Sequence, residues 1–247
     1  MLSVTGVMPM DKKFCITLII ALVMLADVCF IKLYMDKSED KKQVQQFEEI
    51  VSVVEENENT ENKYAALYRQ NKDFAGWISI PYTSIDYPVV QSKSNPDYYL
   101  NHNFKKEYSR FGVPFIQENC DIETSDNIII YGHNMRNKTM FNDLLKYEDR
   151  DFYTEHKLIY FDTLNSESVY EIIAVYKTVA NSGSGFAFND FVNMDDEKEF
   201  YMFIDKCKSL ALYETGISAD YGDKLLTLCT CEYSRDNGRL VVLAKKV

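Results

Sequence analysis

The segment LLTLCTCEYSRDNGRLVVLAKKV occupies residues 225–247 and contains the features that decide the fold. Its first part, 225–233, and its last part, 239–247, are rich in β-branched and aliphatic residues, as expected for buried strands. Asn237 and Gly238 lie between them and favour the positive φ angles of a tight turn. The segment is therefore predicted to form a β-hairpin whose two strands pair directly.

Six further segments upstream share this strand-like composition. They are rich in β-branched and aromatic residues and comprise 76–80, 86–91, 112–117, 127–133, 157–163 and 168–180. Turn-forming residues separate the segments, namely Pro81, SNPD at 94–97, SRFG at 109–112 and NSGSG at 181–185. About eight short strands without a regular alternation of strand and helix predict a mainly β domain over 73–247, built as a barrel or a sandwich.

One segment of this domain has a helical pattern instead. Residues 195–213 begin with a run of acids, and their apolar residues recur at helical spacing. These residues are Phe200, Phe203, Ile204, Cys207 and Leu210. The pattern predicts an amphipathic helix inserted before the strand at 225–233, and Cys207 is interpreted as a core residue.

The N-terminal part contains an apolar run, FCITLIIALVMLADVCFIKLY, from Phe14 to Tyr34. As a helix it would span roughly 32 Å, about the thickness of a bilayer's hydrocarbon core. A cleaved signal peptide would need a small-x-small site after the run, and none is convincing, while a buried core helix fits poorly because the run is apolar all round and lies at the extreme N-terminus. Residues 14–35 are therefore predicted to be an uncleaved transmembrane anchor that follows a short N-terminal segment, 1–13.

The lysines around this run do not define its orientation. Two precede the run and three follow it closely, so the positive-inside rule does not favour an external C-terminus. Residues 36–72 are rich in Lys, Glu, Gln and Asn, with Val44, Phe47, Ile50, Val51 and Val54 on one helix face. This region is predicted to be a helical stalk, broken at 56–62 and followed by a short helix within 63–72.

Composition excludes several classes of function. The 247 residues carry a formal net charge of -11, which argues against a nucleic-acid-binding protein. Cys229 and Cys231 form a single close pair that no second ligand pair matches, so no zinc site is expected. No glycine-rich phosphate-binding loop occurs in the sequence, and no cofactor is expected.

Cys231 and Arg239 are the first candidates for catalysis. If the strands of the C-terminal hairpin pair right up to its loop, these two residues face each other next to the turn. A thiol near a guanidinium suits a nucleophile with a group that stabilises an oxyanion. The alternative is a surface arginine paired with Glu232 or Asp236.

His133 is the third candidate. It follows Gly132 at the end of an apolar strand, where catalytic groups are often found, and a thiol nucleophile needs a base or a positive neighbour. His102 and His156 lie in polar surroundings and are predicted to be solvent-exposed. The order of His133 before Cys231 differs from that of papain-like enzymes, and the caspase signature is absent.

These residues resemble the motifs of a known family. TLCTC at 227–231 resembles the TLxTC signature of sortases, the membrane-anchored cysteine transpeptidases of Gram-positive bacteria, and YGHNM at 131–135 resembles their histidine segment. CEYSRDNGRLVVLAKKV at 231–247 is similar to the C-terminal stretch of class B sortases. The resemblance covers about 70–247. It implies an eight-stranded sortase-type β-barrel with N-terminal helices and one inserted helix before the catalytic strand.

The resemblance also implies an activity and partners. Cys231 would attack the Thr carbonyl of a C-terminal sorting motif in a secreted protein, and His133 would serve as acid and then as base. Arg239 would hold the motif and stabilise the oxyanion, while Thr230 would line the substrate site. A peptidoglycan amine would accept the acyl group. The substrates lie outside the cell, so the resemblance implies a single-pass membrane protein with a short cytoplasmic N-terminus, 1–13, and an extracellular catalytic domain.

One position departs from the usual motif, and two other readings stay open. The variable position of TLxTC is commonly Ser, whereas here it is Cys229, which we expect to be an inert thiol rather than a disulfide partner of Cys231. An L,D-transpeptidase would also use Cys, His and Arg, but in a different sequence context. A membrane-tethered β-barrel binding module would keep Cys231 buried and far from His133 and Arg239.

Overall fold

The computed structural model describes residues 11–58, 62–180 and 185–247. The chain divides into two compact units, one ending at Glu49 and the other comprising Ile50–Val247. Part of the predicted turn at 181–185, part of the predicted break at 56–62 and most of segment 1–13 lie outside the described residues.

The N-terminal unit consists of a helix, α1 (Lys12–Glu56), which continues into the second unit. Its apolar part has a mean hydropathy of 2.8 over 18 residues, and those residues are not buried by the protein. The helix is therefore long and apolar enough to cross a membrane. After α1, the short helix α2 (Ala65–Gln70) lies within the predicted range 63–72.

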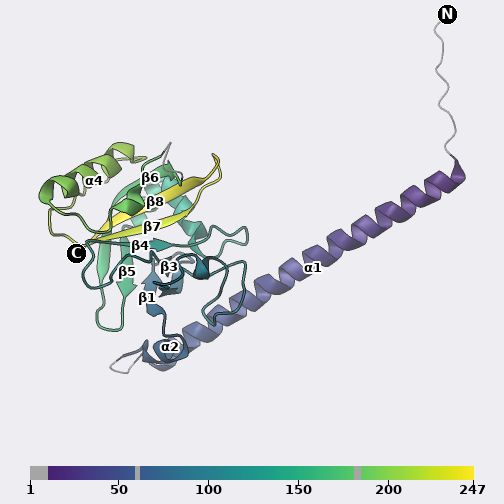
Figure 1. Ribbon diagram of the computed structural model, residues 1–247, viewed down its shortest axis with the longest axis horizontal. Coiled ribbons are helices and arrows are strands. Elements are labelled where there is room, and N and C mark those ends of the chain that lie inside the picture. The colour runs from purple at the N-terminus through teal and green to yellow at the C-terminus, as the bar shows by residue number, and fades with distance from the viewer. Residues whose placement is uncertain (1–10, 59–61, 181–184) are drawn as a thin grey trace, which may run out of the picture. The chain divides into compact units, whose positions relative to one another are not determined.

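The second unit contains a closed barrel of eight strands, and each coincides with a predicted segment (Figure 1). The strands are β1 (Phe74–Ser79), β2 (Asp86–Val90), β3 (Phe115–Ile116), β4 (Asn127–Tyr131), β5 (Leu158–Asp162), β6 (Val169–Val179), β7 (Leu225–Cys231) and β8 (Gly238–Lys246). Of the two predicted architectures, a barrel or a sandwich, the structure has the barrel. β3 is shorter than predicted because Gly112 adopts a φ of +58° and Pro114 lacks an N–H donor.

The order of the strands, β1-β2-β3-β4-β7-β8-β6-β5, brings distant segments together. β4 pairs with β7 in parallel, with Tyr131 beside Cys229, so the C-terminal ends of both strands lie at the same edge of the barrel. β7 then pairs with β8 in antiparallel, which confirms the predicted hairpin. This edge receives the residues that follow β4 and those at the turn between β7 and β8.

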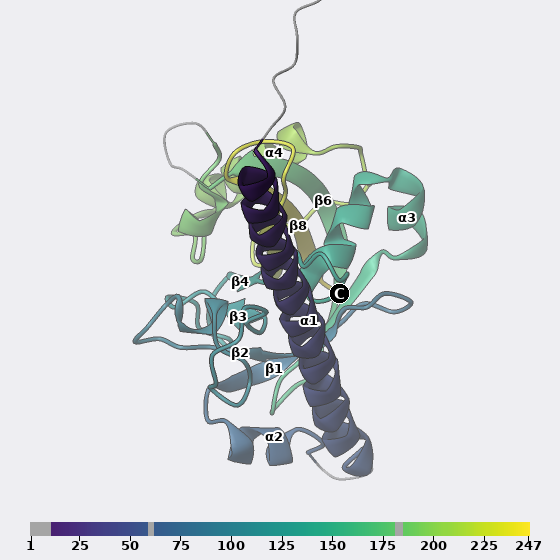
Figure 2. The same ribbon diagram turned by 90° about the vertical axis from the view of Figure 1, so that its right-hand side faces the viewer.

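The other helices cover the barrel. The predicted inserted helix is α4 (Glu197–Leu210), which begins after the N-cap Asp196 and buries Phe200, Phe203, Ile204 and Cys207. It packs on β6, whereas α2 lies near β1, and both views show these positions (Figures 1 and 2). The remaining helices are α3 (Arg150–Glu155) and the 3-10 helices η1 (Tyr98–Leu100), η2 (Phe141–Glu148) and η3 (Phe188–Asp190).

Candidate active site

Cys231 is the last residue of β7, is partly exposed, and pairs in register with Arg239 of β8. Two residues shape the turn between the strands in different ways. Asn237 has the left-handed φ of +54°, while Gly238 does not have a positive φ. Gly238 is instead required because a Cβ there would collide with the carbonyl oxygen of Glu232. The predicted positive φ is therefore correct for Asn237 and wrong for Gly238.

The Arg239 guanidinium is not neutralised by an acid. Its Nη1 donates to the carbonyl oxygen of Gly238 at 2.9 Å, and within the described ranges no carboxylate lies at ion-pair distance. Glu232 is engaged elsewhere, because it accepts from Ser234 N and Oγ at 2.7 Å each and lies 3.5 Å from Lys177 Nζ. The alternative reading of Arg239 as a surface arginine paired with Glu232 or Asp236 is therefore wrong.

His133 follows β4 and is held by a backbone carbonyl from a distant loop. Its Nε2 lies 2.7 Å from the oxygen of Leu100, at the end of η1. A carbonyl oxygen only accepts hydrogen bonds, so Nε2 carries a proton and Nδ1 is the nitrogen free to exchange one. The buried Tyr99 anchors η1, since its hydroxyl donates to Asp73 at 2.7 Å.

Two side chains tie the end of β7 to the loop that carries His133. The Thr230 hydroxyl donates to the Gly132 carbonyl at 2.8 Å. The Asn134 amide donates to the Cys231 carbonyl at 3.0 Å and accepts from Asn142 at 2.6 Å. Sequence reasoning selected Thr230 but missed Asn134, although Asn134 directly follows the candidate histidine.

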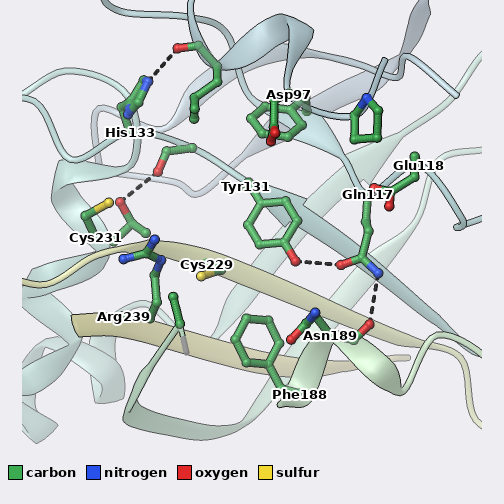
Figure 3. A pocket seen from close by; sticks show the side chains of 16 residues that line it. Asp97, Gln117, Glu118, Tyr131, His133, Phe188, Asn189, Cys229, Cys231 and Arg239 are labelled. Atoms are coloured by element: carbon green, nitrogen blue, oxygen red, sulfur yellow. Dashed lines mark hydrogen bonds between the residues drawn. The ribbon is translucent and has the colours of Figure 1, made fainter. Parts of the chain in front are cut away.

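A cavity of about 460 Å³ lies at this edge of the barrel. It is lined by Pro96, Asp97, Leu100, Phe115, Gln117, Glu118, Tyr131, Gly132, His133, Ala180, Phe188, Asn189, Cys229, Thr230, Cys231 and Arg239. Figure 3 shows His133 and Cys231 at one end, and Gln117, Glu118 and Asn189 at the other. The four residues selected from sequence, Cys231, His133, Arg239 and Thr230, thus line a single cavity.

The other thiols of the barrel domain are buried. Burial raises the pKa of Cys229 to about 12, although nearby Arg239 lowers it in part. Burial likewise raises the pKa of Cys207 to about 12 and that of Cys120 to about 11. All cysteines of the described residues are free, and no group of His, Cys, Asp or Glu among these residues is arranged to hold a metal.

The remaining histidines differ from the sequence expectation. His102 and His156 are both partly buried rather than solvent-exposed. Each ring stacks on an aromatic ring four residues earlier, Tyr98 and Phe152 respectively, with centroids 4.0 Å apart. Polar neighbours in the sequence did not reveal this packing. Neither residue lines the cavity.

Comparisons with known proteins agree with this geometry. The family model described as a sortase domain matches residues 78–247. Sortase B of Listeria monocytogenes is 38% identical over 188 residues, which cover 73% of this chain and 72% of that protein. Sortase B of Staphylococcus aureus is 31% identical over 242 residues, which cover 95% of this chain and 97% of that protein.

Solved structures give the same result. The Staphylococcus aureus sortase B-substrate complex has a TM-score of 0.77 at 29% identity, covering 85% of this chain and 98% of that one. A structure of sortase B complexed with triglycine has a TM-score of 0.76 at 29% identity, covering 84% and 98%. Both confirm the mainly β barrel architecture.

The barrel, the cavity with its cysteine, and these matches define a cysteine transpeptidase, and the chain belongs to the sortase family. Its relatives are sortase B proteins, which places it in class B of that family. The readings as a non-enzymatic binding module and as an L,D-transpeptidase are therefore wrong.

Proposed function

We propose that this sortase cleaves a C-terminal sorting motif of secreted proteins after its Thr and transfers them to a peptidoglycan amine. The observation that carries the proposal is the convergence of Cys231, His133 and Arg239 on one cavity. A covalent intermediate divides the acyl transfer into two easier steps, and each step needs a nucleophile and a proton carrier.

In the first step the Cys231 thiolate attacks the Thr carbonyl carbon, and the bond to the leaving amine breaks. Protonated His133 gives its Nδ1 proton to that amine, while Nε2–H stays bonded to the Leu100 carbonyl. In the second step neutral His133 takes a proton from the incoming amine, which attacks the thioester. The Cys231 thiolate leaves, and both residues return to their starting states.

Arg239 stabilises the oxyanion that forms in both steps. As the register partner of Cys231 it sits beside the reacting carbon, and it has no competing carboxylate among the described residues. A preorganised donor of this kind is worth roughly 10²–10³-fold in rate. Thr230 has a positioning role, because its hydroxyl fixes Gly132 and thereby the backbone next to His133.

Related proteins support the two substrates. The Staphylococcus aureus sortase B structure is a substrate complex, and another sortase B structure contains triglycine. A peptide and a short glycine amine are therefore reasonable probes for this chain. We extend the proposal to location, with α1 crossing the membrane once and the catalytic domain outside the cell, where both substrates occur.

The test is mass spectrometry of the full-length chain in detergent with quenched peptides that contain NPxTN-like and LPxTG-like motifs. We expect a thioacyl adduct on Cys231, cleavage after Thr, and ligation when triglycine is added. C231A is expected to lose the adduct and H133A to lose cleavage, whereas H156Q, whose ring stacks on Phe152 outside the cavity, retains both. Absence of any adduct across the panel would contradict the proposal.

A separate experiment tests the orientation. Protease added to intact cells should digest the catalytic domain if the domain is extracellular, and a reporter fused to the N-terminus should stay protected. A catalytic domain that is protected until the membrane is broken would contradict the proposed location while leaving the proposed chemistry intact.

A further inference from the structure

The loop that follows His133 contains a residue in a costly backbone conformation. Met140 has a φ of +59° and a ψ of -133°, close to the first central position of a type II′ turn, which glycine normally occupies. In a residue with a side chain, the Cβ makes this region unfavourable. Such a conformation persists only where the surrounding structure fixes it. The contacts that fix Met140 therefore bear on the position of His133.

Three contacts hold Met140 in place. Its side chain is fully buried, so the backbone cannot relax without drawing that side chain out of the core. Its backbone forms an antiparallel bridge with Asn134, the residue after His133. Its N–H donates to the hydroxyl oxygen of Tyr87 at 3.0 Å. Tyr87 belongs to β2 and is itself buried, so its hydroxyl reaches the loop from another part of the barrel as a fixed acceptor.

The conformation of Met140 determines where the next N–H points. The ψ angle of Met140 sets the orientation of the peptide that joins it to Phe141, and the Phe141 N–H donates to the His133 carbonyl at 2.9 Å. The Phe141 ring is fully buried and lies so close to Gly132 that a Cβ there would be 2.5 Å from it. Phe141 therefore contacts the backbone at His133 and at the residue before it.

His133 is thus held at two points. Its ring Nε2 lies 2.7 Å from the Leu100 carbonyl oxygen, and its own carbonyl accepts from Phe141. The first contact orients the ring, and the second fixes the main chain from which the ring extends. Proton transfer through Nδ1 needs both to be correct. We propose that Tyr87 is a positioning residue that holds His133 in place through the strained backbone of Met140, an inference that rests on the proposed function.

The experiment compares the wild type with Y87F, which removes the hydroxyl and keeps the ring. Cleavage of quenched NPxTN-like and LPxTG-like peptides with triglycine is measured for the full-length chain in detergent, at a temperature where circular dichroism shows both chains folded. Because misplacing a reacting group by about 1 Å can cost about 100-fold in rate, we expect a smaller displacement to lower kcat roughly tenfold. KM should stay near the wild-type value, because Tyr87 does not line the cavity.

Hydrogen exchange tests the coupling without relying on catalysis. In Y87F the Phe141 N–H, which donates to the His133 carbonyl, should exchange faster, as read by mass spectrometry with fragmentation to single residues. The Gln117 N–H donates to the Ile129 carbonyl of the barrel at 2.9 Å and is the internal reference, which should exchange as in the wild type. A general loss of stability would instead accelerate both amides.

Y64F is the matched control for Y87F. Tyr64 is also buried, and its hydroxyl donates to Asp162 at 2.9 Å, outside the cavity. Y64F therefore loses a tyrosine hydrogen bond without touching the loop after His133, and it should keep both kcat and the exchange rate of the Phe141 N–H. An equal fall of kcat in Y64F and Y87F would overturn the inference.

The two readouts separate this inference from the proposed function. Wild-type kcat in Y87F would overturn the positioning role and leave the transpeptidase proposal standing. Unchanged exchange of the Phe141 N–H in Y87F would overturn the coupling whether or not any peptide is cleaved. A wild-type chain that cleaves no peptide would contradict the proposed function, and faster exchange of the Phe141 N–H in Y87F would then still support the coupling of Tyr87 to the loop.

Discussion

Cys231 and Arg239 are register partners at the turn end of the β7–β8 ladder, and each lines the cavity of about 460 Å³. This pairing holds a thiol and a guanidinium together through backbone hydrogen bonds rather than through a mobile loop. Gly238 helps to maintain it, because the backbone passes too close to Glu232 to admit a side chain. The geometry of the proposed reacting centre is thus built into the hairpin.

R239K is expected to lower kcat/KM roughly 100-fold without unfolding the protein. An ammonium retains the charge but lacks the planar fork of donors that a guanidinium offers an oxyanion. Peptide cleavage and circular dichroism measure the two effects. R235K, in the exposed turn of the same hairpin, is the control and should remain near wild-type activity. Normal turnover in R239K would remove Arg239 from the catalytic site.

Thiol labelling should distinguish Cys231 from the other cysteines of the barrel. Cys120, Cys207 and Cys229 are buried, and burial raises their pKa values to about 11, 12 and 12. Only the thiolate reacts, so iodoacetamide near neutral pH should modify Cys231 in the catalytic domain, as read by peptide mapping.

Two substitutions check the labelling. C231A should abolish modification of the catalytic domain, whereas C229S should retain both modification and cleavage. A label on Cys229, or a Cys229–Cys231 disulfide in the wild-type protein, would show that the thiol beside the nucleophile is not inert.

The sequence predicted local features well because their signals are local. A composition rich in β-branched and aromatic residues, together with turn residues, located all eight strands, and the hairpin placed Arg239 opposite Cys231. The parallel pairing of β4 with β7 joins segments about 100 residues apart, and no local pattern encodes such a partner. The Leu100 carbonyl that holds His133 was missed for a related reason, since a backbone acceptor has no signature in residue type.

Gly132 should be required for the position of His133. A Cβ there would lie 2.5 Å from the ring of the fully buried Phe141, so G132A must displace either that ring or the loop. Overpacking of this kind costs about 1–3 kcal/mol. We expect Tm to fall by roughly 2–12 °C and peptide cleavage to fall at least tenfold.

G222A is the comparison for G132A. Gly222 has a φ of +100° with open space around it, so alanine there strains the backbone without crowding a neighbour. Its Tm should fall while cleavage stays near normal. If G132A also kept normal cleavage at a temperature where it is folded, the close approach at Gly132 would serve stability alone.

Glu232 should make stability depend on acid pH. Burial by itself would raise the pKa of Glu232, but the hydrogen bonds from Ser234 and the charge of Lys177 outweigh burial and hold the pKa below the ordinary 4.5. A group whose pKa is lower in the folded than in the unfolded state stabilises the folded protein. This stabilisation is fully present at pH values above the pKa of the unfolded state. That contribution is lost as pH falls through the folded pKa.

The expected result is that E232Q flattens the acid limb of the stability curve. Between about pH 5 and pH 3 the free energy of unfolding of the wild type should fall more steeply than that of E232Q. Both curves are measured by urea titrations that follow the fluorescence of Trp77, which is buried and is the single tryptophan of the sequence. E155Q, at the exposed end of α3, should follow the wild type.

Because Ser234 and Lys177, rather than Arg239, bind the Glu232 carboxylate, E232Q should keep the Arg239-dependent cleavage at neutral pH. An identical acid limb in E232Q and wild type would mean that the contacts of Glu232 with Ser234 and Lys177 add no net stability.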